Sequence, residues 1–185
     1  MKKTEIVGFK RANLGRSASQ ELRAQGNVPC VLYGGEDQIS FFAPAYLFRP
    51  LLNTPDAYEV ILNIEGTEYT AILQETQFHP VNDQLIHADF LLINPDKVIK
   101  IEVPIKLQGV SLGQQKGGKL VQMLRKLRIQ GPAKNIPEFI SLNIEELDLG
   151  KSIKVGAIQL EGVKILVPAA NPVATITVPR ALRGQ

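Results

Sequence analysis

The sequence has no tryptophan, few other aromatic residues and a single cysteine. Aromatic residues make up 6% of the chain, whereas hydrophobic residues in total make up 44%. We therefore expect an aliphatic core, and the many Val, Ile and Leu residues in alternating patterns favour strands over helices. The lone Cys30 excludes an internal disulfide framework and a zinc site built from the cysteines of one chain.

Long apolar runs are missing as well. No stretch approaches the roughly 18 apolar residues of a membrane span. The basic start MKKTEIVGFK is not followed by the apolar region of a signal peptide. We expect a cytoplasmic protein without a membrane segment.

The net charge of +3 is unevenly distributed. Residues 1–30 hold six Lys and Arg against two Glu, residues 31–95 hold one Arg against nine acids, and residues 96–185 hold fourteen basic against seven acidic residues. The two basic segments suit contact with a polyanion, although such charges also serve to keep a β-rich protein in solution. The charge balance changes at the turn Asn94-Pro95-Asp96-Lys97, so we place a domain boundary there and expect domains at 1–95 and 96–185.

The first domain is predicted to combine strands with short helices. Ser17 and Gln20 have the spacing of a capping box, and Gly26 is typical of the position after a helix, so we expect a helix from Ser17 to Gln25. Residues 45–53 have helical composition, broken at Pro50. Apolar or alternating segments predict strands at residues 28–33, 58–64, 69–73 and 85–93. The strands at 58–64 and 69–73 are expected to form a hairpin.

The second domain is predicted to be mostly strands. Ile101, Val103 and Ile105 share one face of a strand, and NPVATITVP is a strand bounded by prolines. Between them lie short apolar segments separated by Gly or Pro, which is typical of a sandwich or barrel. The segment LVQMLRKL, residues 120–127, fits helical and strand spacing equally well.

One stretch imitates a phosphate-binding loop. GQQKGGKL, from Gly113 to Leu120, fits the pattern G-x-x-x-x-G-K, but Leu120 occupies the position where a Ser or Thr hydroxyl ligates Mg²⁺. Leucine cannot supply that ligand. We therefore interpret the stretch as a Gly-rich hairpin loop with two exposed lysines.

Catalysis would have to draw on Cys30, His79, His87 and Asp89. A Cys–His pair oriented by a carboxylate is a nucleophilic arrangement, yet Cys30 lies in an apolar run, where cysteine usually acts as a small core residue. The spacing of the two histidines and the aspartate does not demand a metal site. We expect neither an enzyme nor a metal protein.

The same polar residues suit a binding surface better. Residues i and i+2 of a strand share a face, so His87 and Asp89 point to one side and Ala88 to the other, and Gln77 with His79 form a similar pair upstream. Such a face is either solvated or presents hydrogen-bonding groups. Arg11, Arg16 and Arg23 could add contacts to phosphates. The phenol of Tyr33 could stack or form a hydrogen bond.

Two motifs of the first domain, GRSASQELRAQGNVPCVLYGG and QETQFHPVNDQLIHADFLLI, resemble the bacterial large-subunit ribosomal protein twenty-five family, which binds 5S ribosomal RNA. The segments GGKLVQMLRKLRI, NIPEFISLNIEELDLGKSI and PVATITVP are similar to the second domain of its long form, the general stress protein Ctc type. The resemblance covers nearly the whole chain. It implies a mainly β protein with some helix, in which an N-terminal β-barrel-like domain with short helices binds 5S RNA and precedes a mostly β domain.

The resemblance also implies a structural, cofactor-free protein of the large subunit in the cytoplasm, whose residues 96–185 can meet neighbouring ribosomal proteins. By default we expect a monomer off the ribosome. The RNA-contacting positions that carry over are Arg11, Arg16, Ser19, Arg23, Tyr33, Gln77, His87 and Asp89.

The sequence departs from the family pattern at Gln20, Glu21 and Phe78, which stand where arginine is common. Losing phosphate contacts lowers both affinity and its salt dependence. The alternative function is therefore a β-rich protein-interaction module acting through residues 96–185, with weakened RNA binding. A basic cluster there can meet RNA, a protein or only solvent; it comprises Arg125, Lys126 and Arg128.

Overall fold

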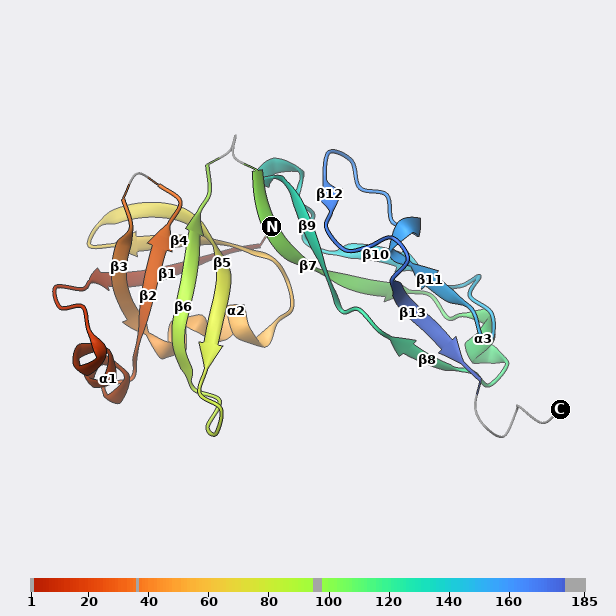
Figure 1. Cartoon of the computed structure of the whole chain (residues 1–185), viewed down its shortest axis with the longest axis horizontal. Coiled ribbons are helices and arrows are strands. Elements are labelled where there is room, and N and C mark those ends of the chain that lie inside the picture. Colours follow the sequence, from red (N-terminus) through yellow and green to blue (C-terminus); the bar gives the residue numbers. More distant parts are fainter. Residues whose placement is uncertain (1, 36, 95–97, 179–185) are drawn as a thin grey trace. The chain divides into compact units, whose positions relative to one another are not determined.

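The computed structural model describes residues 2–35, 37–94 and 98–178 (Figure 1). The chain divides into two units, residues 1–97 and residues 98–185. Strands dominate both, so the predicted mainly β fold is confirmed. Within the described ranges, no helix has the length and apolar character needed to cross a membrane.

Six strands of the N-terminal unit close into a barrel in the order β1-β3-β2-β6-β5-β4. The pairs β1–β4 and β2–β6 are parallel and the others antiparallel. The strands are β1 Lys2–Lys10, β2 Asn27–Tyr33, β3 Ile39–Pro44, β4 Tyr58–Ile64, β5 Thr67–Phe78 and β6 Leu85–Leu92. Closure of the barrel brings β2, from early in the chain, beside β6 at the end of the unit.

Alternate residues of these strands fill the barrel, together with Phe48 from the segment that follows β3. Phe41, Phe48 and Phe90 are completely buried, and the ring centroid of Phe90 lies 5.8 Å from that of Phe41 and 6.2 Å from that of Phe48. The expectation of a purely aliphatic core is therefore wrong for this unit. A few phenylalanines at inward positions suffice, because each ring buries a large apolar area.

Helix α1, Arg16–Ala24, follows β1 and packs against β2. Its N-cap is Gly15, with no side-chain cap, so the predicted Ser17 capping box is wrong. The helix starts one residue before Ser17. Its end agrees with the prediction, since Gly26 has a φ of +80° and donates its backbone N–H to the Arg23 carbonyl.

The segment predicted as a helix broken at Pro50 forms two short pieces. A 3₁₀ turn η1, Ala45–Phe48, leads into α2, Arg49–Asn53. Pro50 lies in the first turn of α2, where its missing N–H costs no hydrogen bond. The proline therefore starts the second piece rather than ending the first.

The predicted hairpin is β4 and β5. Their strands pair from Ile64 opposite Thr67, and the two connecting residues, Glu65 and Gly66, have φ of 51° and 88°. Two successive left-handed residues are the geometry of the type I′ turn that suits the twist of paired strands.

The C-terminal unit contains two sheets. One has the order β10-β7-β9-β12 and the other β11-β13-β8. The elements are β7 Val98–Gln108, α3 Leu112–Gln115, β8 Lys119–Gln122, β9 Lys126–Pro132, η2 Ala133–Asn135, β10 Ile140–Asn143, β11 Ser152–Lys154, η3 Val155–Ala157, β12 Lys164–Ile165 and β13 Pro172–Thr177. The ambiguous segment 120–127 thus runs from the end of β8 through a short connection at residues 123–125 into the start of β9, and forms no helix.

Candidate nucleic-acid interface

The outer surface of β2, β6 and β5 carries a group of polar side chains, here called the polar face; it consists of Tyr33, Glu75, Gln77, His87 and Asp89. Asp89 pairs with Val31 on one side and Glu75 on the other, and His87 pairs with Gln77. The alternate residues Ala88 and Phe90 are fully buried inside the barrel. Register and alternation together put these side chains on one outward surface.

His87 and Asp89 lie side by side on this face. His87 Nδ1 is 3.1 Å from Asp89 Oδ1, and the two side chains are 24% and 25% exposed. The two atoms are not aligned for a hydrogen bond, because Nδ1 has no hydrogen-bond partner within the described ranges. With Nδ1 turned toward the carboxylate, the imidazole presents its other nitrogen away from Asp89.

Tyr33 ends β2 and is 36% exposed. Partial burial raises the pKa of its phenol, and the carboxylates of Asp89 and Glu75 raise it further. The hydroxyl therefore keeps its proton at neutral pH and can donate a hydrogen bond. The strand register places both carboxylates on the same outward surface as the phenol.

Two arginines from the first 23 residues make side-chain hydrogen bonds within the N-terminal unit. Arg11 Nη2 donates to Ser19 Oγ at 2.9 Å, and Ser19 Oγ donates to the Gly15 carbonyl at 2.8 Å. Arg23 Nε donates to the Ile86 carbonyl of β6 at 3.0 Å. The Ile86 bond ties α1 directly to the strand that carries His87 and Asp89.

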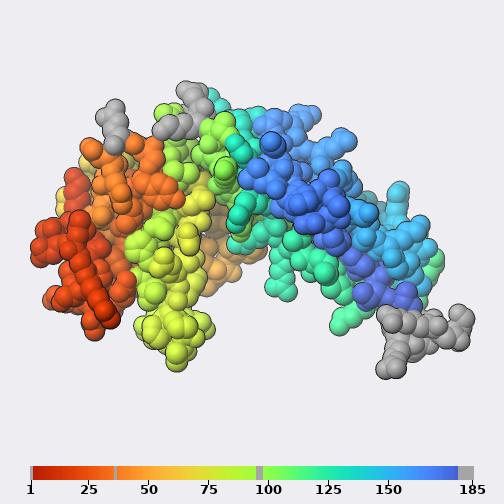
Figure 2. Space-filling view, in the orientation of Figure 1, coloured from red at the N-terminus to blue at the C-terminus, as the bar shows by residue number. Residues whose placement is uncertain are grey.

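Seven of the eight predicted residues thus either lie on the polar face or make a hydrogen bond within the N-terminal unit. Arg16 is the exception, since it is exposed at the first residue of α1 and makes no hydrogen bond or ion pair with any described residue. In the space-filling view, the red segment that contains α1 adjoins the orange and yellow-green segments of β2, β5 and β6 (Figure 2).

Glu75 was not foreseen as part of this face. The alternation Tyr69, Ala71, Leu73 continues to an inward residue 75, but the register shifts between Leu73 and Glu75 and turns Glu75 and Gln77 outward. The sequence carries no clear signal for such a bulge. It adds a second carboxylate beside Asp89.

The predicted pair of Gln77 and His79 does not form. Strand β5 ends at Phe78, and His79 Nδ1 accepts the backbone N–H of Val81 within the loop that follows. Phe78 is 45% exposed at the strand end. Gln20 and Glu21 are exposed on α1, so the three departures from the family pattern all lie at the surface.

The hydrolase interpretation fails at its nucleophile. Cys30 is fully buried between β3 and β6, where burial, chiefly, and Asp89 raise the pKa of its thiol well above the usual range. A thiol held neutral is a poor nucleophile. In the described part of the chain, no three His, Cys, Asp or Glu side chains gather in a group that could hold a metal ion.

In the stretch that imitates a phosphate loop, backbone N–H groups already donate hydrogen bonds to carbonyls of the protein. The N–H of Gly113 donates to the Leu147 carbonyl, that of Gly118 to the Gly113 carbonyl, and Lys116 pairs with Asp148 at 2.8 Å. The stretch contains most of α3 and the first residues of β8. The hairpin interpretation is also wrong, because β8 pairs with β13 and not with β7. It offers no phosphate cradle.

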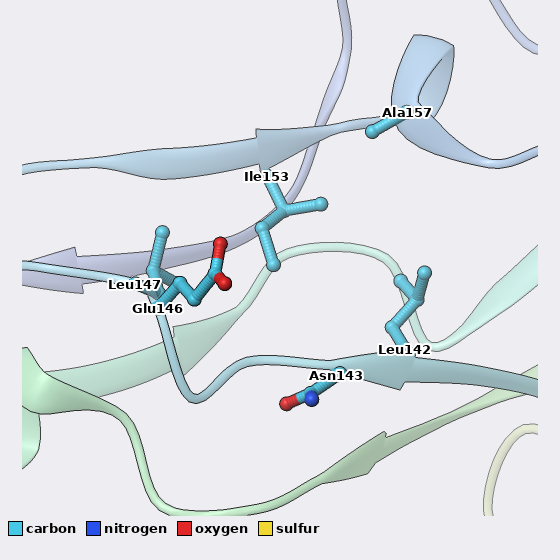
Figure 3. A pocket seen from close by; sticks show the side chains of 6 residues that line it. All are labelled: Leu142, Asn143, Glu146, Leu147, Ile153 and Ala157. Carbon is cyan, nitrogen blue, oxygen red and sulfur yellow. The ribbon is translucent and has the colours of Figure 1, made fainter.

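A cavity of about 480 Å³ lies in the C-terminal unit beside β10 and β11. Figure 3 shows its six lining residues; they are Leu142, Asn143, Glu146, Leu147, Ile153 and Ala157. Glu146 is the single titratable residue among them. An apolar lining with one carboxylate suits neither acid–base chemistry nor a phosphate group.

Comparison with known proteins identifies relatives over the whole chain. Residues 6–90 match the family described as Ribosomal L25p family, and residues 98–180 match the one described as Ribosomal protein TL5, C-terminal domain. Proteins named large ribosomal subunit protein bL25 from Cytophaga hutchinsonii and Amoebophilus asiaticus are 47% and 45% identical. Each alignment spans 100% of this chain, with 96% of the first relative and 94% of the second.

Proposed function

We propose, from the premise that the chain belongs to the ribosomal L25p family, that it is a structural protein of the large ribosomal subunit that binds 5S ribosomal RNA through its N-terminal domain. The family consists of ribosomal proteins and not of enzymes, in keeping with the buried Cys30. The observation that carries the RNA proposal is the junction of α1 with the polar face through the bond from Arg23 to Ile86. We take residues 1–95 as the RNA-binding domain of a protein that is monomeric off the ribosome.

The arginines are proposed to contact phosphates. Arg11 and Arg23 each use one guanidinium N–H within the protein and keep others for RNA, because guanidinium carries five. Ser19 orients Arg11, and Arg16 adds a mobile cation at the start of the helix. Such contacts fix the position of the protein on RNA without reading its sequence.

The polar face is proposed to lie against the shallow minor groove of double-helical RNA. That groove presents 2′-hydroxyls and base edges, which both donate and accept hydrogen bonds. Asp89 accepts from a 2′-hydroxyl or a guanine amino group, while Tyr33 and Gln77 donate. A carboxylate on an RNA-facing surface is reasonable here because it is aimed at hydrogen-bond donors rather than at phosphates.

The test of this proposal is the preference of the full-length chain for 5S rRNA. Labelled 5S rRNA is titrated with protein and then challenged with an excess of an unrelated RNA duplex. We expect the Gln77→Ala/Asp89→Ala variant to lose at least about tenfold of its preference, since even one lost base-edge contact removes on the order of 1–3 kcal/mol of discrimination.

The matched control replaces the exposed Asp37 and Gln38, which precede β3, with alanine. Like the test variant, this control replaces one aspartate and one glutamine with alanine, so the two variants have the same net charge. Equal preference in both variants, or the absence of any preference in the unmodified protein, would contradict the assignment of the polar face to RNA.

A further inference from the structure

The outward surface of the four-stranded sheet in the C-terminal unit is strongly basic. The register places Arg128 opposite Glu102, Gln130 opposite both Lys100 and Lys164, and Lys126 opposite Pro104. The alternate residues, such as Val103, Leu127 and Ile129, are buried in the unit. We call the cationic set the basic sheet face; it comprises Lys100, Lys106, Lys126, Arg128 and Lys164.

The concentration of charge on this face exceeds that of the rest of the unit. Residues 98–178 contain eleven Lys and Arg and six acidic residues. Five of the eleven cations lie on this face, whereas Glu102 is the one acid that the register places among them. The basic character of the second half is therefore not spread evenly over its surface.

Three of the five cations on the basic sheet face make no ion pair with a described residue. Arg128 Nη2 contacts Glu102 at 2.8 Å, and the ammonium of Lys106 lies 4.2 Å from the ring centre of Phe139. Lys100, Lys126 and Lys164 are exposed and have no carboxylate of a described residue within 4.0 Å. These three cations repel one another unless an anion lies across them.

We propose that the basic sheet face binds the phosphate backbone of double-helical RNA, a second RNA contact separate from the one proposed for the N-terminal unit. The four adjacent strands are visible in Figure 1. Lys100 and Lys106 lie about 20 Å apart along β7, given a rise of about 3.3 Å per residue, so the face spans several phosphates. Double-helical RNA is bound mainly through such shape and backbone contacts.

A protein partner fits this face less well. The core of a protein interface is depleted in charge, and lysine in particular is rare there. On the basic sheet face lysine predominates. The exposed apolar side chain of Val98 lies at the first residue of β7, and the ring of Phe139, which precedes β10, has the Lys106 ammonium over it. The charge pattern therefore selects a polyanion.

The test uses the full chain carrying Arg11→Ala/Arg16→Ala/Arg23→Ala, so that binding through the N-terminal unit does not mask the second contact. The probe is a 20-base-pair RNA duplex of mixed sequence, titrated at several salt concentrations. In this background, Lys100→Gln/Lys126→Gln/Lys164→Gln is expected to weaken binding at least about tenfold. It should also reduce the magnitude of the slope of log Kobs against log salt by about 2–3, roughly 0.7–0.9 per lost phosphate contact.

The control in the same background is Lys119→Gln/Lys151→Gln/Lys154→Gln, which removes three exposed cations from β8, β11 and the residue before β11. We expect it to change the slope by less than about 1. Equal effects of the two triple variants would show that only net charge matters and would overturn the proposal. Unchanged RNA binding in the test variant would also overturn the proposal. It would do so even if that variant lost binding to a ribosomal protein, because the face would then bind a protein and not RNA.

Discussion

At the scale of single residues, two arginines of the N-terminal unit are partly ordered in the protein alone. Arg11 is held by Ser19 and Arg23 by the Ile86 carbonyl. An arginine side chain has about 2 kcal/mol of rotamer entropy. Because these hydrogen bonds already restrict the rotamers in the folded protein, less of this entropy remains to be lost on binding. Arg16 makes no such bond with a described residue, so its side chain keeps its rotamer freedom.

The sequence identified the residue types of this surface but not their partners. The arginines, His87 and Asp89 could be proposed from chemistry and spacing because strand alternation is a local property. The contact of Ser19 with Arg11 depends on how α1 folds back toward the end of β1, which no local pattern encodes. Ser19 is therefore better understood as a residue that positions Arg11.

Cys30 makes the stability of the fold pH-dependent in the alkaline range. The folded state keeps the thiol protonated, whereas the unfolded chain releases the proton near its usual pKa of 9.0. Because the unfolded state then binds fewer protons, stability falls as the pH rises above that value. Between pH 8 and pH 10 we expect the free energy of unfolding to drop by about 1.4 kcal/mol more than in Cys30→Ala.

Urea denaturation of the two proteins at both pH values provides the measurement. The alanine variant is its own control for every other titrating group, including Tyr33. Parallel pH dependence in the two proteins would mean that the thiol is not protected in the folded state.

At the scale of elements, alternation predicted most strands of the N-terminal unit and the β4–β5 hairpin. It did not predict the bulge of β5, because one extra residue in a strand changes the face without changing the composition. The start of α1 was also misplaced, since Gly15 caps the helix through its backbone while Ser17 looked like the better cap. Both errors concern geometry that tertiary packing decides.

The end of α1 depends on Gly26. Its φ of +80° lies in the left-handed region, where a Cβ costs about 1–2 kcal/mol although open space surrounds the position. We expect Gly26→Ala to lower the free energy of unfolding by about 1 kcal/mol, and Gly26→Asn by less, because asparagine tolerates this conformation.

Urea denaturation at neutral pH measures both changes. The neighbouring Gln25→Ala is the control, since Gln25 has an ordinary φ of −83° and is exposed. Gly26→Ala and Gln25→Ala with equal stabilities would contradict the account of how the helix ends.

At the scale of the whole molecule, the site exists because the barrel closes. The parallel pairing of β2 with β6 joins residues almost sixty positions apart, from Cys30 opposite Ala88 to Tyr33 opposite Leu91. Local patterns predict strands but not which strands become neighbours, so the barrel was expected from the family resemblance alone. The two-sheet arrangement of the second unit could not be specified beyond its strand-rich character for the same reason.

The central claim is that Arg11 and Arg23 hold 5S rRNA. The most direct measurement is a gel-shift titration of 5S rRNA with the full chain at low and moderate salt, with thermal melting to verify that each variant is folded. We expect Arg11→Ala/Arg23→Ala to bind at least about tenfold more weakly, with a salt slope smaller in magnitude by about 1.5–2.

The control, Arg49→Ala/Lys151→Ala, removes the same charge from exposed positions on α2 and in the C-terminal unit, and we expect it to bind within about twofold of the unmodified chain. If the arginine variant instead binds 5S rRNA as tightly as the control, the N-terminal surface is not the RNA contact.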